Sequence, residues 1–324
     1  MLRLRPKRPA WPRTGHPAAD LYGSPMTTAF VIGRRREGRP TAEVVGQVTG
    51  ILEAGGLNVQ SAVVDRKSDV RRRAAAAVED GCDIVVAVGG DGTVRRVVSA
   101  VSGTATALGI IPTGTGNLLA GNLGIPTRAD RAAATILSGA RRRVDAGVAI
   151  VDGKSYAFAV ACGVGFDAEV MDATPSDAKR RWGKLAYFAS ALAVSGKIRN
   201  VPHEITVDGV TTRTMAAQVM VANFGRMMAV LSPKRPVLPD DGLFEVVIVR
   251  ASGRFAALPA AWEALRQGHL GHSSGGRVFR AQAREVRIVT AQPRLVEIDG
   301  TVVGTTPIQA RIVPAALTVL VPAP

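Results

Sequence analysis

Aromatic residues are scarce in this chain, where tryptophan, tyrosine and phenylalanine together make up 4% of 324 residues. Proteins that bind single-stranded nucleic acid usually stack bases on aromatic side chains, so no nucleic-acid partner is expected. Cysteine is also rare, and the two present, Cys82 and Cys162, lie inside apolar stretches. They are typical of buried, reduced thiols in a cytoplasmic protein and not of a disulfide framework.

Long hydrophobic runs are missing as well. The chain is 47% hydrophobic, yet no run approaches the roughly 18 residues that a membrane-spanning helix needs. The formal net charge is +15, and the excess of basic residues is scattered in short clusters. Such a pattern indicates attraction to an anionic surface, or a basic exterior that is only solvated.

The first 26 residues are rich in arginine and proline, and no apolar segment of the secretory type follows them. We predict that residues 1–26 form a disordered extension. An inert tail and a membrane-seeking arm are the two interpretations of it.

Two common phosphate-binding fingerprints are absent. The chain contains no GxxxxGK[ST] sequence, and no GxGxxG opens its first helical segment, so a P-loop enzyme is excluded. Two other glycine-rich stretches are present instead, "AVGGDGTVRRVV" at 87–98 and "PTGTGN" at 112–117.

The first half of the chain alternates strand and helix patterns. Strands are predicted over 29–33, 57–64, 83–88 and 107–111, with helices over 40–54, 68–81 and 94–101. This order predicts an α/β domain with a parallel sheet over residues 27–145.

The second half has hairpin signals around Asp152-Gly153 and Asp208-Gly209 and further short strand patterns. We therefore predict a β-rich, sandwich-like domain over residues 146–304. The predicted boundary between the two halves lies near Asp145.

The glycine-rich stretches follow strands of the same predicted sheet, where α/β proteins bind ligands. Phosphate oxygens approach the backbone closely where there is no Cβ, and the stretches supply such positions at Gly89, Gly90, Gly92, Gly114 and Gly116. Asp91 would repel a phosphate unless a cation lies between them, which points to a magnesium nucleotide. Thr115 and Asn117 could bind phosphate or ribose oxygens. Either stretch taken alone is also compatible with a structural turn.

Five segments together resemble the diacylglycerol kinase catalytic family, which includes bacterial lipid kinases and sphingosine kinases. They are "GGDGT" at 89–93, "GIIPTGTGNLLAGNLGIP" at 109–126, "CGVGFDAEVM" at 162–171, "PDDGLFEVVIV" at 239–249 and "EIDGTVVGTTPIQA" at 297–310. The GGDGT sequence alone is shared with NAD kinases and phosphofructokinases. The resemblance implies ATP-dependent phosphate transfer to a lipid hydroxyl such as that of diacylglycerol, with Mg²⁺. It also implies that residues 305–324 return to the N-terminal domain.

The resemblance also implies roles for single residues. Gly89 to Thr93, including Gly90, Asp91 and Gly92, would cradle the ATP phosphates, and Thr115 would be a further nucleotide contact. Asp299 matches the acid that activates the acceptor hydroxyl, although Asp-Gly is also the commonest hairpin turn. A structural metal site would use Asp241 and the carbonyl groups of Leu238 and Leu243. The alternative is that "PDDG" is a turn whose aspartate bonds its own backbone.

Three departures from the family pattern are present. Thr301 stands where the family usually has glutamate, Gly33 to Arg36 replace an "NPxSG" turn, and Arg95-Arg96 replace asparagine-glutamate. Two alternatives to a lipid kinase therefore remain: an NAD kinase-like enzyme, and a catalytically impaired homologue that binds nucleotide or lipid. We expect a cytoplasmic protein that acts peripherally on anionic membranes. The sequence does not decide between a monomer and a homodimer.

Overall fold

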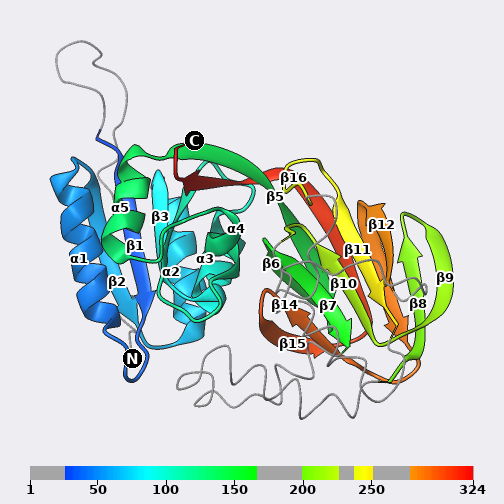
Figure 1. Cartoon of the computed structure of the whole chain (residues 1–324). Coiled ribbons are helices and arrows are strands. Elements are labelled where there is room, and N and C mark those ends of the chain that lie inside the picture. The colour runs from blue at the N-terminus through cyan, green and yellow to red at the C-terminus, as the bar shows by residue number, and fades with distance from the viewer. Residues whose placement is uncertain (1–25, 166–198, 226–236, 251–277, 324) are drawn as a thin grey trace, which may run out of the picture.

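The computed structural model describes residues 26–165, 199–225, 237–250 and 278–323 (Figure 1). The predicted N-terminal extension and part of the "CGVGFDAEVM" segment lie outside the described residues.

The N-terminal half contains four parallel strands with helices between them. The strands are β1 (Thr28–Arg34), β2 (Asn58–Val64), β3 (Ile84–Gly89) and β4 (Ala107–Pro112), in the order β2-β1-β3-β4. The helices are α1 (Thr41–Ala54), α2 (Lys67–Glu79), α3 (Asp91–Val101), α4 (Leu118–Asn122) and α5 (Ala129–Ser138). Helix α1 contacts α5, and α2 contacts α3.

Burial explains why β1, β3 and β4 are almost continuously apolar. Strand β3 is buried at five consecutive residues and β4 at all six, as expected of parallel strands covered on both faces. Strand β1 pairs with β2 on one side and β3 on the other, so the direction of chain winding reverses there. The carboxyl ends of the four strands meet at one edge, which is where open α/β sheets bind ligands.

Two long strands join the halves of the protein. Strand β5 (Ala140–Val151) and β16 (Ile308–Val321) pair antiparallel along most of their length, and Val319 of β16 also pairs with Leu108 of β4. The sheet of the N-terminal domain therefore continues into the C-terminal half through these strands. The predicted boundary at Asp145 lies in the middle of β5, so a single strand belongs to both domains.

The C-terminal half is built from antiparallel strands in two sheets. Strands β13 (Glu285–Thr290), β8 (Val201–Val207) and β9 (Val210–Ala216) extend the first sheet beyond β16, while β6 (Lys154–Phe158) pairs with β5. The second sheet has the order β12-β11-β10-β7-β14-β15. Its strands are β7 (Ala161–Gly165), β10 (Gln218–Ala222), β11 (Phe244–Val249), β12 (Val278–Ala283), β14 (Leu295–Ile298) and β15 (Thr301–Thr305).

A common apolar core lies between these sheets. It combines residues of the first sheet, such as Ile205 and Ile288, with residues of the second, such as Val164, Val219 and Ile298. The expected combination of a parallel α/β domain and a sandwich-like β domain is thus confirmed. No helix in the described ranges has the length and apolar character needed to span a membrane.

Three Asp-Gly pairs form tight hairpins in the C-terminal half. Asp152, Asp208 and Asp299 have φ angles of 48°, 45° and 43°, and the glycine that follows each also has a positive φ. This geometry is the reason for the Asp-Gly sequence, because two-residue hairpin turns of this type need positive φ at both central positions. Asp299 is therefore a hairpin residue, and a catalytic role would be in addition to this structural role.

Candidate active site

The two glycine-rich loops contact each other at the carboxyl edge of the sheet. A Cβ atom added to Gly90 would lie 2.9 Å from the Cα of Gly114, and one added to Gly114 would lie 2.5 Å from the Cα of Gly90. Both distances are shorter than real Cβ atoms tolerate. The glycines are thus required for close packing of one loop on the other, a reason that the sequence did not reveal.

Asp91 fastens the first loop to the second. Its carboxylate accepts hydrogen bonds from the backbone N–H groups of Asn117 at 2.9 Å and Leu118 at 2.5 Å. Burial raises the pKa of Asp91, and these two N–H donors oppose the rise. The structure thus gives Asp91 a loop-joining role, and its predicted contact with magnesium stays a prediction.

Asn117 shapes the second loop. Its side-chain oxygen accepts a hydrogen bond from Gly114 N–H, and its side-chain N–H₂ group donates to the Gly114 carbonyl, both at 2.9 Å. Because both ends of this amide are used within the loop, it holds the backbone in place. Thr115 is exposed between these residues, where its hydroxyl is accessible to a ligand.

Basic side chains surround the same edge of the sheet. Arg34 ends β1, and Arg36 and Arg39 follow it. Lys67 begins α2 after β2, and Arg95 and Arg96 lie on α3 after β3. Arg39 donates to the carbonyl of Thr113 at 3.1 Å, and Arg96 donates to the carbonyl of Gly92. Residues 33–36, which replace the family's usual turn, and Arg95-Arg96, which replace its asparagine-glutamate pair, therefore lie together at this edge of the sheet.

These cations repel one another. Burial, Arg95 and Arg34 lower the pKa of Arg96 to about 10. Burial lowers the pKa of Lys67 as well, with Arg96, Arg34, Arg36 and Arg95 acting in the same direction. Because the mutual repulsion is relieved when an anion binds, this edge is electrostatically suited to a polyphosphate.

Asp299 lies in the hairpin between β14 and β15 and is 6% exposed. Its carboxylate accepts three backbone hydrogen bonds of 2.9 Å: Oδ2 from Ala159, and Oδ1 from Val160 and Ala161. Burial raises the pKa of Asp299 to about 6, although these donors and the Arg95 guanidinium oppose the rise. A carboxylate that titrates near neutral pH is suited to accept and release a proton.

The Asp299 hairpin lies against the first glycine-rich loop. A Cβ added to Gly92 would be 4.0 Å from Oγ1 of Thr301, and the Arg95 guanidinium carbon lies 6.0 Å from the centre of the Tyr156 ring. Helix α3 and strand β6 are in contact. The structure therefore brings the glycine loops and Asp299 together across the boundary between the two domains.

The predicted metal site has a different local geometry. Asp241 Oδ1 accepts the N–H of Leu243 at 3.0 Å, which is the self-bonded turn considered as the alternative. The buried Asp145 holds this loop by accepting the N–H of Gly242 at 2.7 Å, and Leu238 is 48% exposed. This geometry favours the turn interpretation, and a metal at this loop stays a prediction.

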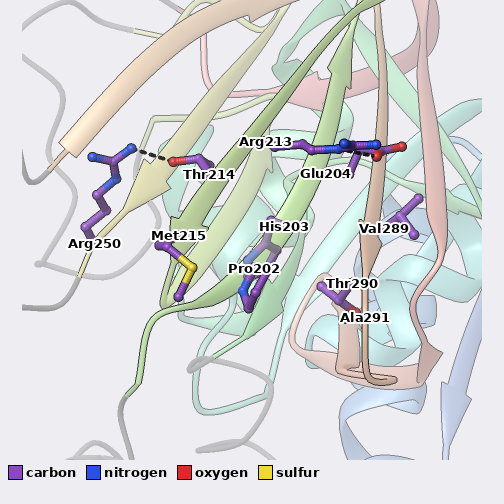
Figure 2. Close-up of a pocket in the computed structure, with 10 residues that line it drawn as sticks. All are labelled: Pro202, His203, Glu204, Arg213, Thr214, Met215, Arg250, Val289, Thr290 and Ala291. Atoms are coloured by element: carbon purple, nitrogen blue, oxygen red, sulfur yellow. Dashed lines mark hydrogen bonds and ion pairs between the residues drawn. The ribbon is translucent and has the colours of Figure 1, made fainter.

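A separate cavity of about 660 Å³ lies at the β8–β9 end of the first sheet (Figure 2). Figure 2 shows the Arg213–Glu204 ion pair and the hydrogen bond from Arg250 to Thr214 at its margin. The described residues that line this cavity include none of the site residues that the sequence predicts.

Sequence reasoning missed several residues of the site. Lys67 looks like an ordinary helix residue, and Tyr156 like part of a hairpin. Glu297 of β14 lies two residues before Asp299 of the following turn, and both are buried. The available signal for Glu297 was its position as a charged residue in an otherwise apolar strand pattern directly before the Asp-Gly turn.

Comparison with known proteins agrees with this architecture. Residues 29–149 match the diacylglycerol kinase catalytic domain, and residues 160–321 match the YegS C-terminal NAD kinase beta sandwich-like domain. A diacylglycerol kinase of Mycobacterium tuberculosis is 30% identical over 280 residues, which cover 84% of this chain and 87% of that protein. An uncharacterized protein of Synechocystis sp. is 27% identical over 80% of this chain, but the match covers only 60% of that longer protein.

A solved structure shows the same fold. The crystal structure of a diacylglycerol kinase from Bacillus anthracis str. Sterne superposes with a TM-score of 0.68 at 21% identity, over 91% of this chain and 96% of that one. The matched ranges cover both domains, and they include the glycine loops and the Asp299 hairpin described above. The chain therefore belongs to the diacylglycerol kinase catalytic domain family.

Proposed function

We propose that this protein transfers the γ-phosphoryl group of ATP to the hydroxyl group of a lipid such as diacylglycerol. The observation that carries the proposal is the arrangement at the carboxyl edge of the sheet. Two packed glycine loops and a group of mutually repelling cations lie there, next to a buried carboxylate with a pKa of about 6.

The residues divide the work between nucleotide and acceptor. The N-terminus of α3 and the surrounding cations would bind the phosphates, because exposed N–H groups and positive charge both attract anions. Asp299 would accept the proton of the lipid hydroxyl while the oxygen of that hydroxyl bonds to the γ-phosphorus. The bond from that phosphorus to the β-phosphate oxygen breaks, and ADP leaves. Such transfer depends mainly on position and charge, which this site supplies.

The residues at the loops fit a magnesium ion that is held chiefly by the nucleotide. Asp91 would provide one carboxylate through the lone pairs that its bonds to Asn117 and Leu118 leave free, and Mg²⁺ often combines one or two carboxylates with substrate phosphates. Within the described ranges, no group of three or more acidic, histidine or cysteine side chains offers a dedicated metal cage. When bound, the ion would neutralise charge on the phosphate oxygens.

A lipid-panel assay with radiolabelled ATP tests the proposal. We expect labelled phosphate to appear on a lipid that carries a free hydroxyl, with NAD as the comparison acceptor. Phosphorylation of NAD alone would support the NAD kinase-like alternative. ATP binding without turnover on any lipid or on NAD would support the impaired homologue, in which Thr301 fails to replace the family's glutamate.

The reaction should depend on pH through Asp299. The protonated carboxyl cannot accept the hydroxyl proton, so we expect kcat/KM to fall as the pH drops through about 6 and to level off above that pH. The activity falls on the acid side because only the ionised carboxylate accepts a proton. The fall comes at a higher pH than for an exposed aspartate because burial raises the pKa of Asp299. Initial rates over about pH 5 to 8 would measure it. A rate that stays constant well below the pKa of Asp299 would contradict this assignment.

A lipid substrate also predicts binding to membranes. Because the chain carries a formal charge of +15, we expect it to sediment with anionic vesicles and to dissociate as salt rises. Neutral vesicles of otherwise equal composition are the control. Equal binding to both kinds of vesicle at high salt would indicate insertion of apolar side chains instead.

A further inference from the structure

Arg95 is a buried cation at the junction of the two domains. It lies on α3, two residues after the GGDGT sequence, and is 7% exposed. Its guanidinium lies over Tyr156 of β6, so it extends from the nucleotide domain toward the β-rich domain. Burial lowers the pKa of Arg95, while Asp299, Tyr156 and Glu297 oppose this change.

Apart from the ring of Tyr156, the guanidinium has no hydrogen-bond or ion-pair partner among the described residues in spite of this burial. Its Nε is fully enclosed and makes no hydrogen bond. The ion pairs among the described residues do not include Arg95. Asp299 influences it electrostatically but uses its own oxygens for the N–H groups of residues 159–161. Burying a guanidinium without hydrogen-bond acceptors costs free energy, so its presence indicates that a bound ligand supplies the missing acceptors.

The position of Arg95 selects the ligand group. Arg95 lies on the helix that begins in the first glycine loop, and its charge acts on the carboxylate of the Asp299 hairpin. In the proposed reaction, the group that passes between these two places is the γ-phosphoryl group. Planar guanidinium groups bind phosphate oxygens with paired, directional hydrogen bonds, which lysine cannot reproduce.

The geometry points to Arg95 as the residue of this chain that binds the γ-phosphate of the nucleotide and holds it facing Asp299. This inference rests on the proposed function, and it gives a role to an arginine where the family usually has asparagine. Arg95 would then stabilise the charge that spreads over the phosphoryl oxygens during transfer.

The test compares two nucleotides that differ at the γ-position. We expect Arg95→Met, which keeps much of the side-chain volume, to weaken binding of the non-hydrolysable ATP analogue AMP-PNP about tenfold or more. Binding of ADP should change less than about twofold, because ADP lacks the contacted group. Isothermal titration calorimetry with Mg²⁺ measures both constants, and ADP binding also shows that the variant is folded.

Two further variants sharpen the result. Arg73→Met removes one exposed charge from α2 and should change neither constant, which separates a local contact from the loss of net charge. Arg95→Lys keeps the charge but loses the planar fork, so we expect it to recover only part of the AMP-PNP affinity.

Other outcomes would overturn the inference. Equal weakening of AMP-PNP and ADP would assign Arg95 to the structure of the loop. Unchanged binding with a pH profile shifted to higher pH would mean that Arg95 only keeps Asp299 ionised. Among the described residues, Arg95 and Cys162 interact electrostatically with that carboxylate, and Tyr156 and Glu297 interact with Arg95. A parent protein that binds neither nucleotide would refute the proposed function together with this inference, whereas normal parent binding without a difference between the nucleotides refutes the inference alone.

Discussion

Replacing Asp299 by asparagine is expected to reduce lipid phosphorylation about 100- to 10,000-fold, the range typical of a lost general base. Asparagine accepts the positive φ of the hairpin about as well as aspartate does. It cannot take a proton from the acceptor hydroxyl. Initial rates with radiolabelled ATP would measure the loss, and turnover within a few-fold of the parent would remove Asp299 from the mechanism.

The backbone contacts of Asp299 predict a cost in stability as well. An asparagine could keep the bonds from Val160 and Ala161 through its oxygen, but its N–H₂ group would face the N–H of Ala159. In a hairpin turn without such contacts, asparagine would leave the melting temperature unchanged. The structure instead predicts a loss of about 1–3 kcal/mol in the free energy of unfolding, because a buried donor is left without an acceptor.

The chain offers a matched control in Asp208. It occupies the same place in the β8–β9 hairpin with a φ of 45°, and its carboxylate also accepts backbone N–H groups, those of Arg284 and Glu285. It lies away from the glycine loops. We expect Asp208→Asn to affect stability but to leave kcat within about twofold of the parent, since the proton acceptor is intact. A comparable loss of activity in both variants would show that the hairpin geometry, and not the carboxylate of Asp299, is what matters.

Replacing Gly90 by alanine is expected to weaken ATP binding at least tenfold, and valine should abolish it. The φ of Gly90 is −93°, which any residue can adopt, so the cause is not backbone strain. The new Cβ would lie 2.9 Å from the Cα of Gly114 and would push the two glycine loops apart. Forcing extra volume into such a contact typically costs about 1–3 kcal/mol, part of which is lost phosphate binding.

Gly46→Ala is the control for this substitution. Gly46 lies in α1, and a Cβ there would meet nothing within 4 Å. Alanine at that helical position should raise the melting temperature slightly and leave ATP affinity unchanged. Calorimetric titration of both variants with ATP, beside their thermal melting curves, separates lost binding from lost folding. Parent-like ATP affinity in Gly90→Ala would show that contact between the loops is not needed for the nucleotide.

Much of the architecture follows from local pattern. The apolar runs that became β1, β3 and β4 are continuous because both faces of these parallel strands are buried. Asp-Gly marks each of three hairpins because positive φ favours these residues. These signals depend on near neighbours in the chain, so they can be recognised without the fold. The glycine loops could be placed at one edge for the same reason, since parallel strands end together.

Other features were decided only by tertiary structure. The contact of Gly90 with Gly114, the carboxylate of Asp91 on Asn117 and Leu118, and the three N–H groups around Asp299 each join segments far apart in the sequence. The sequence predicted that Asp299 is either a hairpin residue or a base. The fold made it a hairpin residue whose pKa is raised, because the second domain buries that turn against α3 while Asp208 and Asp152 remain in exposed hairpins. Burial depends on what packs above a residue, and no local pattern contains that information.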